Sequence, residues 1–272
     1  MLNKIIWLAS YPKSGNTFLR LLLTNYLFNE ENLNQFELIR KIPKFEKKEL
    51  FENILKKKIN SENFDYIKNS LFVQEELCKK FSPYELIFKT HHFYGSLDGN
   101  KFTSSQYTNF FIYIVRDPRE VLVSYAHHSG ITIKDCFEVF IDKSLGHKKI
   151  FETIIRWDYH YKSWRSFKNV PSIIIKYEDL IDNTEKVLSK VLKELAKILN
   201  FSINSQKIKK AIKDNEFSAL KKLEKKSKFH ESINDNFFRS GKKDTWKDFL
   251  TKDQIKIIEK EFNSEMKELN YL

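Results

Sequence analysis

Four short apolar runs constrain the fold of this chain more than any other feature of its sequence. They are residues 4–10 (KIIWLAS), 85–90 (ELIFKT), 109–115 (NFFIYIV) and 172–177 (SIIIKY). Runs that are apolar at successive positions predict strands buried on both faces. Helical patterns separate the runs, and strands that alternate with helices predict a parallel sheet covered on both sides. We therefore predict an α/β fold with three layers, in which helices cover both faces of a central parallel sheet.

Periodicity and end signals predict where several helices begin. Residues 15–28 carry apolar side chains at helical spacing directly after the first run. Pro118 lies where it would occupy the first turn of a helix after the third run. Asn183 is expected to cap a helix whose apolar stripe ends near Ile198. Residues 30–82 show mixed helical periodicity and predict helices over or beside the sheet.

The length and composition fit a single domain that spans residues 1–272. No stretch is rich in glycine and serine, so no linker divides the chain. The apolar run at residues 5–9 is too short for a signal peptide or a membrane span, and we expect no membrane anchor. Cys78 and Cys136 fit neither a disulfide framework nor a metal site, which favours a reducing cytoplasm.

The formal net charge of +12 is compatible with nucleic acid, an anionic membrane surface or a polyanionic small molecule as a partner. The lysine excess is spread along the whole chain, so we expect most lysines to be solvated. Nucleic-acid binding predicts basic residues interleaved with exposed aromatic residues, or a helix-turn-helix. The sequence contains neither as a coherent motif, and a nucleic-acid-binding protein is therefore the alternative and not the leading hypothesis.

Polar residues follow each of the four apolar runs. They occupy residues 11–17, 89–92, 116–119 and 177–179. Ligands of open α/β sheets bind beyond the carboxyl ends of the strands. We therefore expect these four segments to converge on one site.

The first of these segments has the character of an anion-binding loop. Residues 13–17 (KSGNT) lie between a predicted strand and a predicted helix, where unpaired N–H groups and the helix dipole favour an anion. The Walker pattern is absent, because Asn16 and Thr17 stand where it requires Lys and Ser or Thr, and no Gly lies five residues before Gly15. A magnesium-dependent kinase or GTPase is disfavoured, and no metal-ligand cluster is apparent. Taken alone, the loop also fits a capped helix with a surface lysine.

Six segments, in order along the chain, together resemble the cytosolic sulfotransferases. They are residues 11–18 (YPKSGNTF), 89–91 (KTH), 113–124 (YIVRDPREVLVS), 157–164 (WDYHYKSW), 177–179 (YED) and 238–246 (FRSGKKDTW). The resemblance implies a fold like that of the P-loop nucleotide kinases. It also implies that the cosubstrate is 3′-phosphoadenosine 5′-phosphosulfate (PAPS), that the product is adenosine 3′,5′-bisphosphate (PAP), and that no metal takes part.

The same resemblance assigns three catalytic roles. His91 would be the general base that takes the proton of an acceptor hydroxyl or amine, and a pKa near neutrality suits that task. Lys13 would contact the oxygen of the leaving phosphate, and Lys89 would steady the sulfuryl oxygens. The acceptor would be a small molecule or a glycan. A catalytically inactive nucleotide-binding scaffold is a further alternative, but the presence of both Lys13 and His91 speaks against it.

The PAPS-binding residues are also carried over from the resemblance. Residues Ser14, Gly15, Asn16 and Thr17 would surround the 5′-phosphosulfate with Lys13. Arg116 and Ser124 would bind the 3′-phosphate, for which arginine offers a bidentate fork; an ion pair of Arg116 with Asp117, Glu120 or Glu178 is the structural alternative. Phe18 replaces a tryptophan that stacks on adenine, with a purely structural core position as its alternative. The remaining adenosine contacts would be Tyr177, Asn215, Phe217 and Leu220.

Arg239, Ser240 and Gly241 match the family element that closes over the 3′-phosphate, with Ser240 in place of lysine. Lys242 or Lys243 could compensate for the lost charge.

The family's dimer motif fails, because Lys252 and Lys256 stand where valine and glutamate are expected. We therefore leave the choice between monomer and dimer open. Residues 30–82 and 128–150 are expected to shape the acceptor pocket, whose substrate the sequence does not identify.

Overall fold

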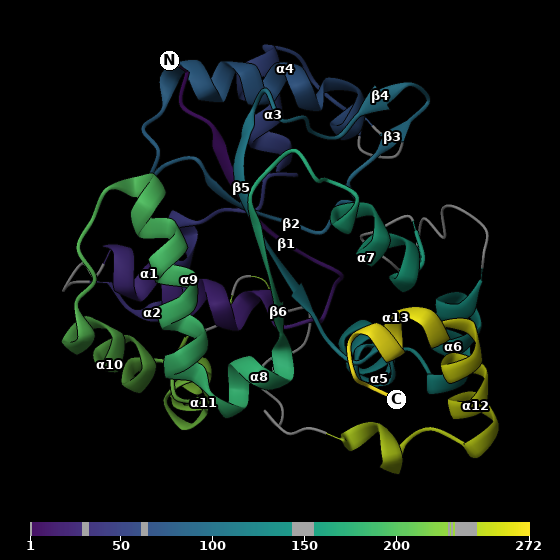
Figure 1. Ribbon diagram of the computed structural model, residues 1–272. Coiled ribbons are helices and arrows are strands. Elements are labelled where there is room, and N and C mark those ends of the chain that lie inside the picture. The colour runs from purple at the N-terminus through teal and green to yellow at the C-terminus, as the bar shows by residue number, and fades with distance from the viewer. Residues whose placement is uncertain are drawn as a thin grey trace.

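The computed structural model describes residues 2–28, 33–60, 65–142, 155–227, 229, 231 and 244–272. Its centre is a parallel sheet with the strand order β2-β1-β5-β6 (Figure 1). The strands are β1 (Ile5–Ser10), β2 (Ile87–Thr90), β5 (Thr108–Val115) and β6 (Ser172–Lys176). All four predicted strands are therefore confirmed. A short hairpin, β3 (Ser96–Leu97) with β4 (Asn100–Lys101), was not expected.

The strands end together at one edge of the sheet. Ala9 of β1 is paired with Thr90 of β2, and Ser10 is paired with Ile114 of β5. Parallel strands in this register bring the loops that follow them to the same side. The register thus positions the predicted site.

Alternate side chains of the strands enter two separate cores. Trp7 of β1 and Tyr113 of β5 belong to the core on one face, whereas Leu8 and Ile112 belong to the core on the other. Both cores are closed by helices, as expected for a parallel sheet buried on each side. The predicted three-layer arrangement is confirmed (Figure 1).

The helices divide between the two faces. The second core is covered by α1 (Asn16–Phe28), α8 (Tyr177–Asp182), α9 (Thr184–Leu199) and α10 (Ser205–Asp214). The first core is covered by α3 (Lys48–Leu55), α4 (Asp65–Lys80), α5 (Pro118–Ser129), α6 (Ile133–Ile141), α7 (Trp157–Arg165), α12 (Lys252–Glu261) and α13 (Asn263–Glu268). The remaining helical elements are α2 (Gln35–Leu38), α11 (Phe217–Lys226) and the 3-10 helices η1 (Ile39–Lys41) and η3 (Thr245–Asp248).

Two predicted helix starts have different outcomes. Pro118 occupies the first turn of α5, as predicted, and Asp117 caps this helix by accepting a 2.9 Å hydrogen bond from the N–H of Arg119. Asn183 precedes α9, but its side chain makes no capping hydrogen bond. Asn183 also ends α8, and its backbone, with a φ of −133° and a ψ of 49°, lies outside the extended region that capping residues normally adopt. The predicted position was right, and the predicted side-chain cap was wrong.

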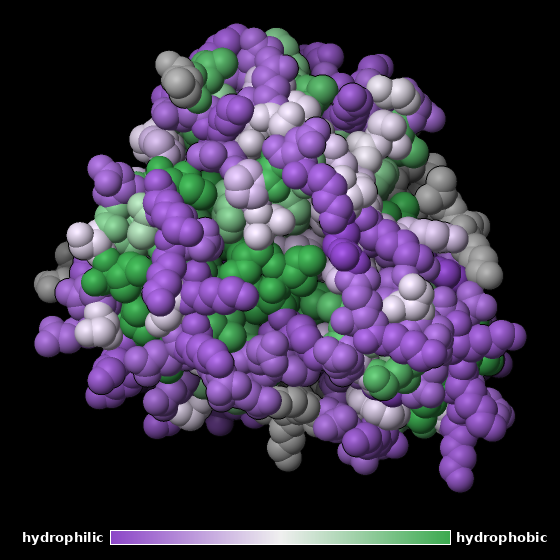
Figure 2. Space-filling view, viewed as in Figure 1, coloured by the Kyte–Doolittle hydropathy of each residue, from purple (hydrophilic) through white to green (hydrophobic). Residues whose placement is uncertain are grey.

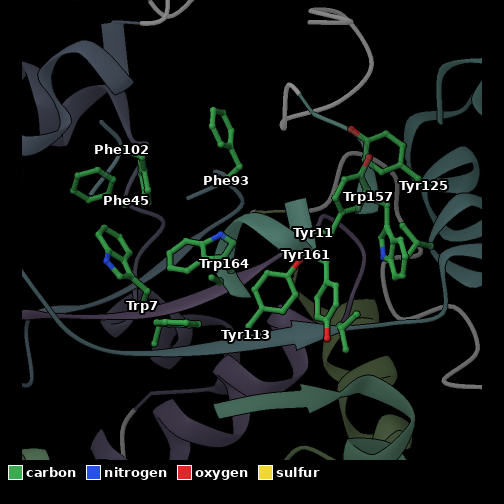
Figure 3. Close-up of a cluster of buried hydrophobic side chains, with 14 of the residues drawn as sticks. Trp7, Tyr11, Phe45, Phe93, Phe102, Tyr113, Tyr125, Trp157, Tyr161 and Trp164 are labelled. Atoms are coloured by element: carbon green, nitrogen blue, oxygen red, sulfur yellow. The ribbon is translucent and has the colours of Figure 1, made fainter. Parts of the chain in front are cut away.

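Aromatic side chains dominate the first core (Figure 3). Trp157, Tyr161 and Trp164 of α7 are buried, and so is Trp246. Cys78 and Cys136 are buried free thiols, and burial raises their pKa values to about 11 and about 12.

The visible surface is mostly hydrophilic (Figure 2). β6 forms the outer edge of the sheet in the described part of the chain, and Ile174 on this strand is exposed. None of the described helices is both long and apolar enough to cross a membrane.

Candidate active site

The loop between β1 and α1 has a backbone shaped for close approach to a ligand. Lys13 has a φ of 66° and Gly15 has a φ of 95°, a region that L side chains adopt rarely. α1 begins at Asn16, directly after this turn. The N–H groups of Phe18 and Leu19 donate to the carbonyl of Gly15, and those of Asn16 and Thr17 lie at the end of the helix that meets the loop. A Cβ atom on Gly15 would lie 2.2 Å from Cδ2 of Tyr177. The loop therefore requires glycine at this position, and Tyr177 packs against it.

Buried polar atoms in the loop have hydrogen-bonding capacity to spare. Ser14 is fully buried, and its hydroxyl has no hydrogen-bond partner among the described residues. The side-chain amide of Asn16 donates to the carbonyl of Leu8 at 2.9 Å and to the hydroxyl of Ser10 at 3.2 Å, whereas its carbonyl oxygen has no partner there. A buried polar group without a partner is costly unless a ligand or water satisfies it. An anionic oxygen in the loop would satisfy the Ser14 hydroxyl.

His91 lies beside this loop at the end of β2. Its Nδ1 is 2.8 Å from the carbonyl oxygen of Ser10. A carbonyl oxygen can only accept, so Nδ1 carries the hydrogen and the lone pair of the neutral ring is on Nε2. The side chain is only 7% exposed, and its orientation is fixed by β1. The arrangement offers a proton acceptor next to the anion-binding loop.

A second histidine supports the backbone of the first. His160 of α7 donates from Nε2 to the carbonyl oxygen of His91 at 3.0 Å and accepts at Nδ1 from the hydroxyl of Tyr113 at 2.8 Å. Burial lowers the pKa of His160 to about 3. His92 stacks on Phe102 with ring centroids 4.8 Å apart, and burial lowers its pKa to about 4. Both of these histidines therefore make structural contacts.

Arg116, after β5, is tied to the loop. Its guanidinium donates to the carbonyl of Lys13 at 3.1 Å and to Glu120 at 2.9 Å, and it lies 4.4 Å above the ring of Tyr177. The ion pair with Glu120, the structural alternative considered for Arg116, is therefore present. Ser124 is partly buried on α5, the helix that follows Arg116. The joint contact of Arg116 and Ser124 with a phosphate stays a prediction.

The residues proposed to contact adenosine lie around α1. Phe18 is partly buried against the second core. Phe217 and Leu220 of α11 pack in a small cluster with Leu21 of α1. Asn215 is buried and donates to the carbonyl of Ala211 at 2.8 Å. Leu220 is only 1% exposed, so its contact with a nucleotide, like those of the other three, stays a prediction.

Part of the predicted site lies outside the described residues. This applies to Arg239, Ser240 and Gly241, and to Lys242 and Lys243, which could compensate for the serine. Within the described part of the chain, no group of three or more His, Cys, Asp and Glu side chains is arranged to hold a metal ion.

The family described as "Sulfotransferase domain" matches residues 3–270. This chain belongs to the sulfotransferase domain family. The family and the enzyme class predicted from the sequence motifs, a sulfotransferase, are thereby confirmed.

Three relatives of known function resemble this sulfotransferase over almost its whole length. Amine sulfotransferase of Oryctolagus cuniculus is 23% identical over 97% of this chain and 81% of the relative. Luciferin sulfotransferase of Photinus pyralis is 27% identical over 92% of this chain and 68% of the relative. Flavonol 3-sulfotransferase of Flaveria bidentis is 26% identical over 94% of this chain and 79% of the relative.

Solved structures share the fold of this sulfotransferase. A mouse sulfotransferase in complex with PAP matches with a TM-score of 0.60 at 18% identity, covering 97% of this chain and 84% of that one. Retinol dehydratase in complex with androsterone and PAP matches with a TM-score of 0.62 at 20% identity, covering 96% and 80%. The expected sulfotransferase fold is confirmed.

The sequence did not reveal a charge cluster that includes one of the predicted catalytic residues. Lys89, predicted to act in catalysis, is paired with Glu231 at 3.1 Å, and Glu231 is also bound by Arg20 of α1 at 2.9 Å. Burial alone would raise the pKa of Glu231, but the neighbouring Lys89 and Arg20 hold it well below its usual range. Arg20 could have been noticed as a lone charge within the apolar stretch 18–23 (FLRLLL). Glu231 carries no comparable signal, because its role depends on tertiary contacts.

Proposed function

We propose that this sulfotransferase transfers the sulfuryl group of PAPS to a hydroxyl or amine of a small-molecule or glycan acceptor and releases PAP. The observation that carries the proposal is the placement of His91 next to the loop at residues 13–17. His91 offers a ring nitrogen with a lone pair, and the loop offers the buried hydroxyl of Ser14, which has no partner among the described residues. Both lie at the carboxyl edge of the sheet, on neighbouring strands.

The loop suits the 5′ end of PAPS for physical reasons. The N–H groups of the first turn of α1, the Ser14 hydroxyl and the Lys13 ammonium can all donate to phosphate and sulfuryl oxygens. The helix dipole adds a favourable potential at the same end. Arg116 would bind the 3′-phosphate with its guanidinium, which Glu120 and the Lys13 carbonyl already hold in place.

The transfer would be an in-line displacement at sulfur. The acceptor oxygen or nitrogen forms a bond to sulfur while the bond between sulfur and the 5′-phosphate oxygen breaks, and the electron pair stays on that phosphate. His91 Nε2 takes the acceptor proton, as a general base within reach of the attacking atom. Lys13 stabilises the charge that develops on the leaving phosphate, and Lys89 stabilises the sulfuryl oxygens. Positioning and electrostatic stabilisation supply most of the rate enhancement, as in phosphoryl transfer.

The names of the relatives support a small-molecule acceptor, since one is named for amines, one for luciferin and one for flavonol. Within residues 30–82 and 128–150, predicted to shape the pocket, α6 supplies Phe140, whose ring lies 5.9 Å from that of Tyr11. Tyr11 in turn lies 5.5 Å from the ring of His160, next to the backbone of His91. These three rings are buried, so the contact of an acceptor with them stays a prediction.

Two features of the whole protein also remain proposals. We propose a cytoplasmic location, on the sparse cysteine content of the sequence. The choice between monomer and dimer stays open, because Lys252 and Lys256 break the dimer motif; Thr251, the threonine of that motif, caps α12 by accepting from the N–H of Gln254.

Ligand binding tests the donor, and transfer tests the reaction. PAP should raise the melting temperature by mass action, whereas AMP, which lacks the 3′-phosphate, should not. Equal responses to PAP and AMP would overturn the role of Arg116 and Ser124. Labelled PAPS with a panel of phenols, alcohols, amines and sugars should then yield a sulfated product from at least one class. Binding of a DNA or RNA oligonucleotide in place of PAP would favour the nucleic-acid alternative.

A further inference from the structure

Glu231 connects two cations that come from distant parts of the chain. Its carboxylate accepts two hydrogen bonds from one guanidinium nitrogen of Arg20, both at 2.9 Å. One of its oxygens also accepts from the ammonium of Lys89 at 3.1 Å. Arg20 lies on α1, whose N-terminus forms the anion-binding loop, and Lys89 lies on β2 just before His91. The carboxylate therefore joins the loop helix to the strand that carries the proposed base.

Arg20 is a fixed anchor for this carboxylate. The side chain is 1% exposed, and its remaining contacts are with the carbonyl oxygens of Ile42 at 3.1 Å and Ile39 at 3.2 Å. A buried guanidinium requires a counter-charge, and removal of its partner is strongly unfavourable. Because Arg20 holds both oxygens of Glu231, the carboxylate keeps its position whether or not a ligand binds nearby.

The position of the Lys89 ammonium depends on its side-chain contacts, because the hydrogen bonds of the Lys89 backbone fix only the main chain. The backbone is fixed by hydrogen bonds from its N–H to Pro43 and from the N–H of Phe45 to its carbonyl, both at 2.9 Å. The ammonium, in contrast, sits at the end of a flexible four-carbon chain. Its contact with the Glu231 carboxylate therefore limits the directions in which the ammonium can point.

The net charge of the cluster suits an anionic ligand. One carboxylate between two cations leaves one positive charge, so the cluster as a whole still attracts the sulfuryl end of PAPS. The low pKa of Glu231 keeps the carboxylate ionised at physiological pH.

We propose that Glu231, held by Arg20, is a positioning residue that acts through Lys89 and directs its ammonium toward the sulfuryl oxygens of PAPS. The inference rests on the proposed function and deepens it. It differs from a counter-ion role, in which Glu231 would merely occupy Lys89 and would have to leave before PAPS could bind.

The two roles predict opposite changes in the preference for PAPS over PAP, which lacks the sulfuryl group. In the Glu231→Gln variant, positioning predicts about a tenfold loss of this preference, the effect of weakening one hydrogen bond to a charged group. The affinity for PAP should change little. The kcat should fall on the order of 10- to 100-fold, as expected when a reacting group is misplaced. A counter-ion role predicts tighter PAPS binding instead.

A double-mutant cycle shows whether Glu231 acts through Lys89. Isothermal titration of PAPS and PAP would be run on the wild type, Glu231→Gln, Lys89→Ala and the double variant. Positioning predicts that Glu231→Gln adds no further loss of PAPS preference once Lys89 is alanine. Additive losses, an unchanged preference or a tighter PAPS complex would each overturn the inference. A wild type that binds neither PAPS nor PAP would instead overturn the proposed function.

Glu261→Gln is the matched control. Glu261 pairs with another buried guanidinium, that of Arg156, at 2.8 Å. Its replacement by glutamine should leave the preference for PAPS unchanged. If Glu231→Gln does not fold because Arg20 loses its counter-charge, Glu231→Asp retains the charge but shortens the side chain. The Asp variant should then lose PAPS preference in the same direction, and an unchanged preference would overturn the inference.

Discussion

The ring of His91, the proposed general base, is oriented by a contact with the neighbouring strand β1. The motif at residues 89–91 predicts a base, but the structure adds the contact that orients it. The Ser10 carbonyl takes the Nδ1 hydrogen at 2.8 Å and leaves the lone pair on Nε2. His92, one residue later, is stacked on Phe102 in the core. Two adjacent histidines thus have different surroundings, because successive residues of an extended segment point in opposite directions.

Replacement of His91 by asparagine should separate binding from transfer. We expect kcat to fall about 10²- to 10⁴-fold, the usual contribution of a general base, with the affinity for PAP unchanged. Labelled transfer to an active acceptor and calorimetric titration of PAP would measure the two quantities. His127→Asn, at an exposed position on α5, serves as the control and should keep both. Wild-type turnover by the His91 variant would place the base elsewhere.

The loop, α1 and α8 form a unit at the scale of secondary structure elements. The sequence predicted the loop and the helix because glycine and the apolar spacing are local signals. It did not predict that the ring of Tyr177, at the start of α8, fills the space next to Gly15. Nor did it predict the contact of Arg116 with both the loop and Glu120. Contacts between elements depend on how the sheet brings the elements together, which a single sequence does not specify.

Gly15→Ala tests the packing of this unit. The new methyl group would require both a strained φ and displacement of Tyr177, so we expect weaker PAP binding and a loss of stability of about 1–3 kcal/mol. Urea denaturation and PAP titration would measure the two effects. Gly130→Ala is a matched control, because its φ of 66° is also positive but no atom lies within 4 Å of the added carbon. Equal effects of the two substitutions on PAP binding would show that the contact with Tyr177 is unimportant.

At the scale of the whole molecule, the sequence predicts best those features that depend on the burial of apolar side chains. The apolar runs predicted the strands, and their alternation with helices predicted the layers. The polar residues that follow the runs predicted the edge of the sheet at which the candidate site lies. The far end of the chain was not predictable in this way. Tyr271 donates its hydroxyl to Glu178 at 2.8 Å, and its carbonyl accepts from Arg119 at 2.9 Å. These contacts fasten the C-terminal segment beside the site, and their partners are distant in sequence.

Two histidines, the buried His160 and the partly buried His92, should make the whole protein sensitive to acid. The pKa of His160 is lowered to about 3 and that of His92 to about 4, chiefly by burial, from an ordinary value of 6.5. Between these values and 6.5 the unfolded chain binds protons that the folded protein does not, so stability is complete above pH 6.5 and declines as the pH falls. Each histidine contributes about 1.4 kcal/mol per pH unit in that window. We therefore expect the free energy of unfolding to fall by about 4 kcal/mol from pH 7 to pH 5.

Urea denaturation at several pH values would measure this decline. The interval from pH 7 to pH 5 isolates the histidines from Glu231, because a carboxylate with a lowered pKa loses its contribution only as the pH falls below its unfolded value of 4.5. Glu178 has a pKa raised by burial and acts in the opposite direction, since it stabilises the folded state as it gains a proton.

His160→Gln should reduce the slope of stability against pH by about half, because one of the two protons is then no longer taken up on unfolding. A stability that is independent of pH between 7 and 5 would show that His92 and His160 can be protonated in the folded protein, and that their burial does not exclude charge.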